Sequence, residues 1–119
     1  MQPFSMNPAD RVRLQHMRDA VELAARFIDG RLRGDLDTDP MLLFALVRAI
    51  EIIGEAAARV SEETRADIEI PWTAVVGMRN RLIHAYFDVD KDILWATAVQ
   101  SLPALGNALR QALDSSSGL

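Results

Sequence analysis

The chain has 119 residues, of which half are apolar, and it contains no cysteine and two histidines. We expect a single domain over residues 1–119, because this length can bury one core, and the lack of cysteine excludes disulfides and thiolate metal sites. The formal net charge of −4 argues against non-specific coating of nucleic acid, which depends on neutralising many phosphates.

The first predicted helix begins after Asn7. Asn7 is a good N-cap, Pro8 suits the first helical position, and Asp10 in the first turn complements the helix dipole. Apolar residues then recur mostly at three- and four-residue spacing and form one stripe of Val12, Met17, Ala20, Val21, Ala24, Phe27 and Ile28. Residues 30–39 are rich in Gly and Asp, and they are expected to form a loop.

A second long helix is predicted from Asp39 and Pro40, which repeat the cap-plus-proline signal. Its expected buried face consists of Leu43, Leu46, Val47, Ile50, Ile53, Gly54 and Ala57. Gly54 lowers helix propensity, and the alanines beside it indicate that another backbone passes close to this point. Ser61 is then expected to open a short extra turn.

Two further helices are predicted. The third runs from Pro71 to about Phe87, and the fourth is capped by Asp88 or Asp90. Pro103 is expected to kink the fourth helix, because it removes a backbone donor and clashes with the preceding turn. The apolar side of this helix contains Ile93, Leu94, Val99, Leu102, Leu105, Leu109 and Leu113. Residues 114–119 are expected to form a frayed tail.

These elements predict an all-α fold, an antiparallel bundle of four to five helices joined by short loops. No signal-peptide pattern and no run of roughly 18 apolar residues is found, so we expect a soluble cytoplasmic protein that makes no membrane contact. Two histidines are too few to favour a heme or metal bundle, and no cofactor or metal is expected.

The charges are unevenly distributed along the chain. Residues 35–69 carry three arginines and nine acids, whereas residues 70–87 carry two arginines and no acid. A cleft built around Arg79 and Arg81 could therefore be locally positive, which is compatible with one bound phosphate or a short strand.

Residues 79–86 contain the most chemically informative cluster: Arg79, Asn80, His84 and Tyr86. On a continuous helix, at about 100° per residue, Asn80 and His84 share one face, and Arg79 and Tyr86 share a second. Both faces of the helix end are therefore polar, which is not expected of a core helix.

Over about residues 10–111 the chain resembles the HepT-like members of the HEPN superfamily, small all-α ribonuclease toxins. The family motif is an arginine followed by a polar residue, a histidine five positions after the arginine and a tyrosine two beyond it, which Arg79, Asn80, His84 and Tyr86 match. Supporting matches are Arg48-Ala-Ile-Glu-Ile-Ile-Gly-Glu-Ala, Ile70-Pro71-Trp72 and Tyr86-Phe87-Asp88.

The resemblance implies a HEPN-like homodimer with its active cleft at a two-fold interface. It also implies a toxin of a type VII-like HEPN/MNT toxin-antitoxin system, a metal-independent endoribonuclease. The implied partner is a minimal nucleotidyltransferase antitoxin, which silences the toxin by adenylylation of Tyr86.

The residue chemistry agrees with cleavage of RNA, where the 2′-hydroxyl attacks the neighbouring phosphorus without a metal. A histidine can serve as general base or acid near neutral pH, whereas a guanidinium stays charged and its donors match a phosphate, so His84 suits the first task and Arg79 the second. Asn80 can orient the imidazole or bind a phosphate oxygen. Arg79, Asn80 and His84 are the predicted catalytic residues.

Other interpretations remain open. Arg79 could pair with a carboxylate on another helix and His84 could compensate a helix dipole, in a non-catalytic dimeric helical module that docks a nucleotidyltransferase. Glu51 and Glu55 resemble a divalent-metal pair, but ion pairs with neighbouring arginines are favoured.

Overall fold

The computed structural model describes residues 6–84 and 88–116. Its elements in chain order are α1 (Pro8–Ile28), α2 (Asp35–Thr38), α3 (Pro40–Ala58), α4 (Glu62–Asp67), α5 (Trp72–Val76), α6 (Met78–Leu82), α7 (Lys91–Ala96), the π-helical segment η1 (Thr97–Ser101) and α8 (Leu102–Ser116). Within the described residues the sole extended pairing is one antiparallel bridge between Ile83 and Val89. The fold class is all-α, as predicted.

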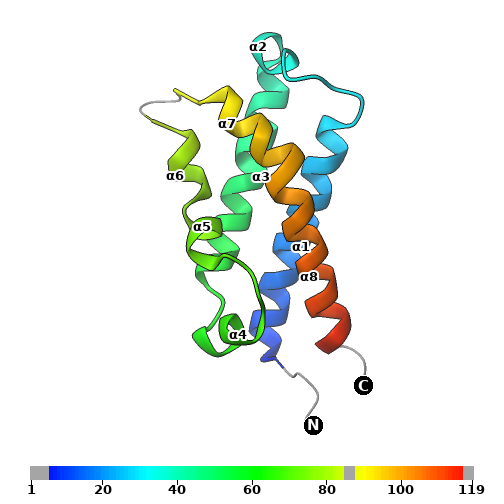
Figure 1. The fold of residues 1–119 in the computed structure, drawn as a ribbon, viewed down its shortest axis with the longest axis vertical. Helices are drawn as coiled ribbons and strands as arrows, with labels where there is room; N and C mark the ends of the chain where they lie inside the picture. Colours follow the sequence, from blue (N-terminus) through cyan, green and yellow to red (C-terminus); the bar gives the residue numbers. More distant parts are fainter. Residues whose placement is uncertain (1–5, 85–87, 117–119) are drawn as a thin grey trace.

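Four helical segments alternate in direction and form the bundle: α1, α3, the α5–α6 pair and the continuous α7–η1–α8 rod. Figure 1 shows α3 between α1 and the α5–α6 pair, and α3 contacts both. The rod covers this layer, with α8 packed on α1 and α7 packed on α6. The large side chains buried most completely come from all four segments and from α2: Leu14, Met17, Leu36, Leu46, Ile50, Ile53, Leu82, Leu94, Leu102 and Leu109.

The predicted helix starts are confirmed by their caps. The side chains of Asn7, Asp39, Ser61 and Asp90 accept hydrogen bonds from backbone N–H groups two or three residues further on, at 2.7 to 3.3 Å. These bonds satisfy donors that the first helical turn leaves without a partner. The expected loop 30–39 differs in one respect, because it contains the short helix α2.

The fourth helix departs from regular α geometry just before Pro103. The five residues of η1 are π-helical, and the backbone N–H of Leu102 bonds to the carbonyl of Thr97. A wider turn at this point accommodates a proline that has no N–H to donate and whose ring crowds the preceding turn. The helix then continues to Ser116, so that residues 114–116, which we expected in the tail, are helical.

One expected core residue of α1 is exposed. Val12 lies at the surface, and Leu14 occupies the buried position of that turn. None of the described helices combines the length and the apolar character needed to span a membrane.

Gly54 lies where α3 meets the end of α5. A Cβ at this position would stand 3.3 Å from the carbonyl oxygen of Val76 and 3.6 Å from that of Val75. The first distance is tighter than ordinary van der Waals contact with a backbone atom that cannot rotate away. The close backbone approach predicted for Gly54 is confirmed, and it holds the α5–α6 pair directly against α3.

Asp10 ties the start of α1 to the connection between α3 and α4. Its carboxylate is 4% exposed and accepts hydrogen bonds from the Ser61 backbone N–H at 3.1 Å, the Ser61 hydroxyl at 2.5 Å and the Thr64 hydroxyl at 2.6 Å. Burial alone would raise the pKa of Asp10, but these hydrogen bonds together outweigh it and leave the pKa below its ordinary value. The ionised carboxylate therefore stabilises the fold.

We expect Asp10→Asn to lower the free energy of unfolding by about 2 kcal/mol at pH 7, because it replaces charge-assisted acceptors with a neutral amide. Since the folded pKa of Asp10 lies below the unfolded one, its contribution is complete above about pH 4 and is lost as the pH falls through the folded value. The gap between wild type and variant should therefore shrink toward pH 2.

Urea unfolding followed by circular dichroism at pH 7 and at low pH measures this gap. Glu22→Gln is the control, because Glu22 is an exposed carboxylate on the same helix. An equal loss of stability at both pH values would contradict a role for the ionised form.

Candidate functional site

Arg79 and Asn80 lie on α6, which is a separate five-residue helix and not the end of a long one. The predicted continuous helix from Pro71 is wrong, because the chain breaks at Gly77 between α5 and α6. Glycine is a weak helix former, and the Gly77 carbonyl accepts a three-residue bond from the Asn80 N–H at 3.1 Å. Met78 and Leu82 bury one side of α6, which leaves the residues between them exposed.

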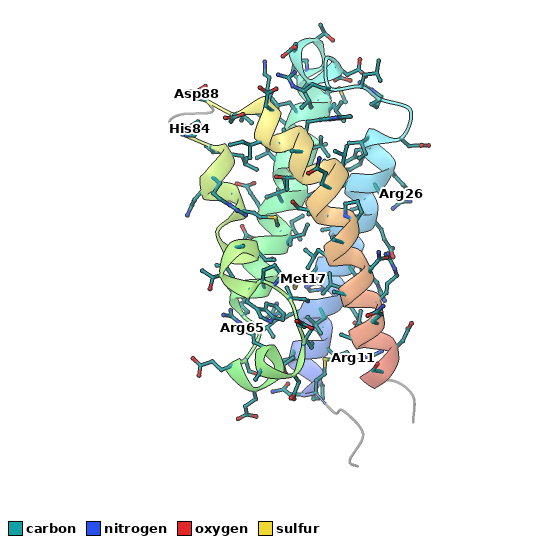
Figure 2. All side chains as sticks on the ribbon, viewed as in Figure 1. Arg11, Met17, Arg26, Arg65, His84 and Asp88 are labelled. Atoms are coloured by element: carbon teal, nitrogen blue, oxygen red, sulfur yellow. The ribbon has the colours of Figure 1, made fainter. Side chains whose placement is uncertain are left out.

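The helix ends at Leu82, two residues before His84. The Leu82 carbonyl accepts the backbone N–H of Asp90 at 2.7 Å, so it is not available to a following helical turn. Ile83 is extended and bridges to Val89, and the His84 N–H bonds to the Asp88 carbonyl at 3.0 Å. Figure 2 shows His84 and Asp88 side by side at one end of the molecule.

The prediction that Asn80 and His84 share one helix face is therefore wrong. Asn80 and His84 do not belong to one helix, so the 100° rule does not relate them. Tyr86, the predicted modification site, lies outside the described residues, and its relation to Arg79 is not described.

The guanidinium of Arg79 is held by a carboxylate on α3. Its Nε donates to Oε2 of Glu51 at 2.9 Å, and 49% of the Arg79 side chain remains exposed. Glu51 is 26% exposed, and its second oxygen lies 3.7 Å from Nη1 of Arg48. The pairing of Arg79 with another helix, which the sequence left open, is confirmed. It uses Nε and leaves about half of the side chain exposed.

Two hollows flank this ion pair along the α3–α6 seam. One, of about 470 Å³, is lined by Phe44, Arg48, Glu51, Arg79, Ile83 and Val89, among others. The other, of about 260 Å³, is lined by Glu51, Gly54, Glu55, Arg79 and Asn80, among others. Arg79 and Glu51 line both hollows, so the pair stands at the centre of one groove, which we call the Arg79 groove.

His84 lies beyond the end of α6 and lines neither hollow of the Arg79 groove. Its side chain is 56% exposed, and Nε2 stands 3.9 Å from Oδ2 of Asp90. That distance is too long for a hydrogen bond, although it is close enough for attraction when the imidazole is protonated. The position is open to solvent and therefore to a substrate.

Asp90 is a site residue that the sequence indicated only as a helix cap. It caps α7, its backbone holds the end of α6, and its carboxylate faces His84. The start of α7 is fixed in turn by Arg33, whose Nε donates to Asp92 at 2.7 Å. Arg33 also donates to Asp37, and this bond holds the pKa of Asp37 below its ordinary value.

Glu51 and Glu55 both lie near Arg48. Arg48 stands 3.7 Å from Glu51 and 3.5 Å from Glu55, which agrees with the predicted ion pairs, but Arg59 makes none with the residues that the structure describes. Over the same residues no group of three or more potential ligands comes together.

Trp72 is structural. Its indole Nε1–H donates to the carbonyls of Arg65 and Ile68, both at 3.2 Å, and the Arg65 guanidinium lies 5.5 Å from the ring centre. The ring anchors α4 to α5 and is not available as a platform for a base.

Comparison with known proteins identifies close relatives. A family model described as "Ribonuclease HepT-like" matches residues 17–112. A "Probable ribonuclease HepT" of Thermococcus cleftensis is 40% identical over 77% of this chain and 84% of its own. A "Putative RNase" of Caldanaerobacter subterraneus is 36% identical over 85% of this chain and 91% of its own. No solved structure matches the chain.

Proposed function

Because the chain belongs to the ribonuclease HepT-like family, we propose that it is a metal-independent endoribonuclease that uses Arg79, Asn80 and His84. The observation that carries this assignment is the position of Arg79, which is clamped through Nε to Glu51 and keeps about half of its side chain exposed at a groove. A guanidinium held in this way is oriented before an anion arrives, so less side-chain conformational entropy is lost on binding.

The proposed reaction begins when the 2′-hydroxyl of a ribose attacks the adjacent phosphorus. His84 takes the hydroxyl proton, and Arg79 stabilises the charge that grows on the non-bridging oxygens. The bond from phosphorus to the 5′-oxygen breaks, and this oxygen receives a proton, which leaves a 2′,3′-cyclic phosphate and a 5′-hydroxyl. DNA lacks the attacking group and is not cleaved.

One chain supplies one suitable imidazole, whereas the reaction calls for a base and an acid. We therefore place the active cleft at the two-fold interface of a homodimer, where a second His84 serves as the acid. The surface beside the Arg79 groove supports this arrangement, because Phe44 lines the groove and is 55% exposed, and Met41 one turn before it is 82% exposed. Large apolar side chains gathered at a surface favour burial against another chain.

The chain is further proposed to be the toxin of a type VII-like HEPN/MNT system, silenced by a nucleotidyltransferase antitoxin that adenylylates Tyr86. Tyr86 follows His84 by two residues in the sequence. An adenylate attached there adds bulk and negative charge close to the histidine, which opposes the approach of a substrate phosphate.

The first prediction concerns the reaction itself. Purified wild type should cleave RNA in the presence of a chelator and release 2′,3′-cyclic phosphate ends, whereas His84→Ala should lose at least about a hundredfold in rate. Gel analysis of labelled RNA, with the same strand carrying 2′-deoxyribose as control, measures this. Inactivity of a folded wild type whose Tyr86 is unmodified would favour the non-catalytic docking module.

The second prediction concerns Tyr86. Tyr86→Phe should keep cleavage within about twofold of wild type, because no step of the reaction is assigned to the phenol, and it should resist the antitoxin because the acceptor oxygen is gone. Cleavage assays after incubation with antitoxin and ATP, together with mass spectrometry for added adenylate, test it. Full silencing of the variant by an active antitoxin would refute the assignment.

The third prediction concerns Glu51 as the positioning residue of Arg79. Glu51→Ala should lower kcat about tenfold, equivalent to about 1.4 kcal/mol, while KM stays level or falls because the groove becomes more positive. Glu51→Gln should recover most of the loss, since the amide oxygen can still accept from Nε of Arg79.

Glu22→Ala is the control, because Glu22 is an exposed carboxylate of α1 that lines neither hollow of the Arg79 groove. A wild-type kcat in Glu51→Ala, measured at saturating RNA, would show that Arg79 does not depend on this carboxylate.

A further inference from the structure

A further hollow lies on the other side of α3, between α3 and α1. Its volume is about 210 Å³, and its lining residues include Arg13 and His16 from α1 and Arg48, Glu55 and Arg59 from α3. Three guanidinium groups and one imidazole therefore face a space that contains one carboxylate. We call it the Arg13–Arg59 hollow.

The charge balance of this hollow differs from that of the other arginine clusters. Arg31 and Arg33 are each bound by aspartates of the α2 region, as is usual in a protein with more acids than bases. In the Arg13–Arg59 hollow, Glu55 contacts Arg48, and neither Arg13 nor Arg59 forms an ion pair within residues 6–84 and 88–116. Two cations are thus left to attract an external anion.

The hollow adjoins the Arg79 groove. Arg48 lines both it and the larger part of the groove, and Glu55 lines both it and the smaller part. In Figure 1, α3 stands between α1 and the α5–α6 pair, so the two recesses flank one helix. Arg48 and Arg59 are eleven residues apart, about 16 Å along the axis at 1.5 Å per residue.

We propose that the Arg13–Arg59 hollow binds backbone phosphates of the RNA strand outside the cleavage site, and this inference rests on the proposed ribonuclease function. A strand whose scissile phosphate lies at Arg79 continues across the exposed side of α3 to Arg48 and then to Arg13 and Arg59. The contacts are with phosphates, so they add affinity without selecting a base. The site explains how an acidic protein holds a polyanion.

The test compares two variants with the same loss of charge. Arg13→Gln with Arg59→Gln removes the hollow's unpaired cations, whereas Arg26→Gln with Arg110→Gln removes two arginines that line neither recess. Binding is measured by fluorescence anisotropy with a labelled 20-nucleotide single strand of 2′-O-methyl RNA, which has no free 2′-hydroxyl and cannot be cleaved.

The hollow variant should raise Kd about tenfold at 0.1 M salt, and the magnitude of the slope of log K against log salt should fall by about 1.4, or 0.7 for each lost phosphate contact. The control pair should change Kd less than twofold.

With cleavable RNA, the hollow variant should raise KM and leave kcat unchanged. Thermal melts establish that both variants fold, and Arg59→Gln alone, at an exposed position, should give half the change in slope.

Equal binding by the hollow variant and the control pair would overturn the inference, as would a fall in kcat with unchanged KM. If wild type cleaves no RNA and the hollow variant still loses binding selectively, the phosphate site stands and the ribonuclease assignment fails. The two proposals can therefore fail separately.

Discussion

The contact between Gly54 and the carbonyls of Val75 and Val76 is the constraint on which the site depends. It allows the backbone at the end of α5 to approach α3 more closely than any side chain at position 54 would permit. Glu51 lies one turn before Gly54 on α3, and Arg79 lies in the first turn of α6, just after the break at Gly77. The close approach therefore brings carboxylate and guanidinium within 2.9 Å and defines the seam that becomes the groove.

The short length of α6 has a chemical consequence. If α6 continued to His84, the position of the histidine relative to Arg79 would be fixed by helix geometry. Instead α6 ends at Leu82, whose carbonyl accepts the backbone N–H of Asp90. The Asp90 carboxylate also faces His84. Arginine and histidine are thus supported by different partners, Glu51 on α3 and Asp90 at the start of α7, so their relative position depends on how the α7 end packs.

The sequence predicted what depends on local chemistry. The caps Asn7, Asp39, Ser61 and Asp90 could be predicted because cap residues act on donors two or three residues away. The close approach at Gly54 could be predicted because a glycine followed by a run of alanines leaves room for another backbone. The break at Gly77 and the end of α6 at Leu82 could not be predicted from the sequence. The stop is set by a hydrogen bond from Asp90, eight residues away, and Asp10 is buried by partners more than fifty residues distant.

Net charge is a poor guide to what this protein can bind, because several of its acids are engaged elsewhere. Aspartates 35, 37, 39 and 92 pair with Arg31 and Arg33 at the α2 end of the bundle, and Asp10 is enclosed by hydroxyls at the other end. The α1–α3–α6 layer keeps four arginines around two glutamates. Because screening limits the reach of distant charges to about 10 Å in moderate salt, a phosphate at this face experiences the arginines more strongly than the aspartates of the α2 end.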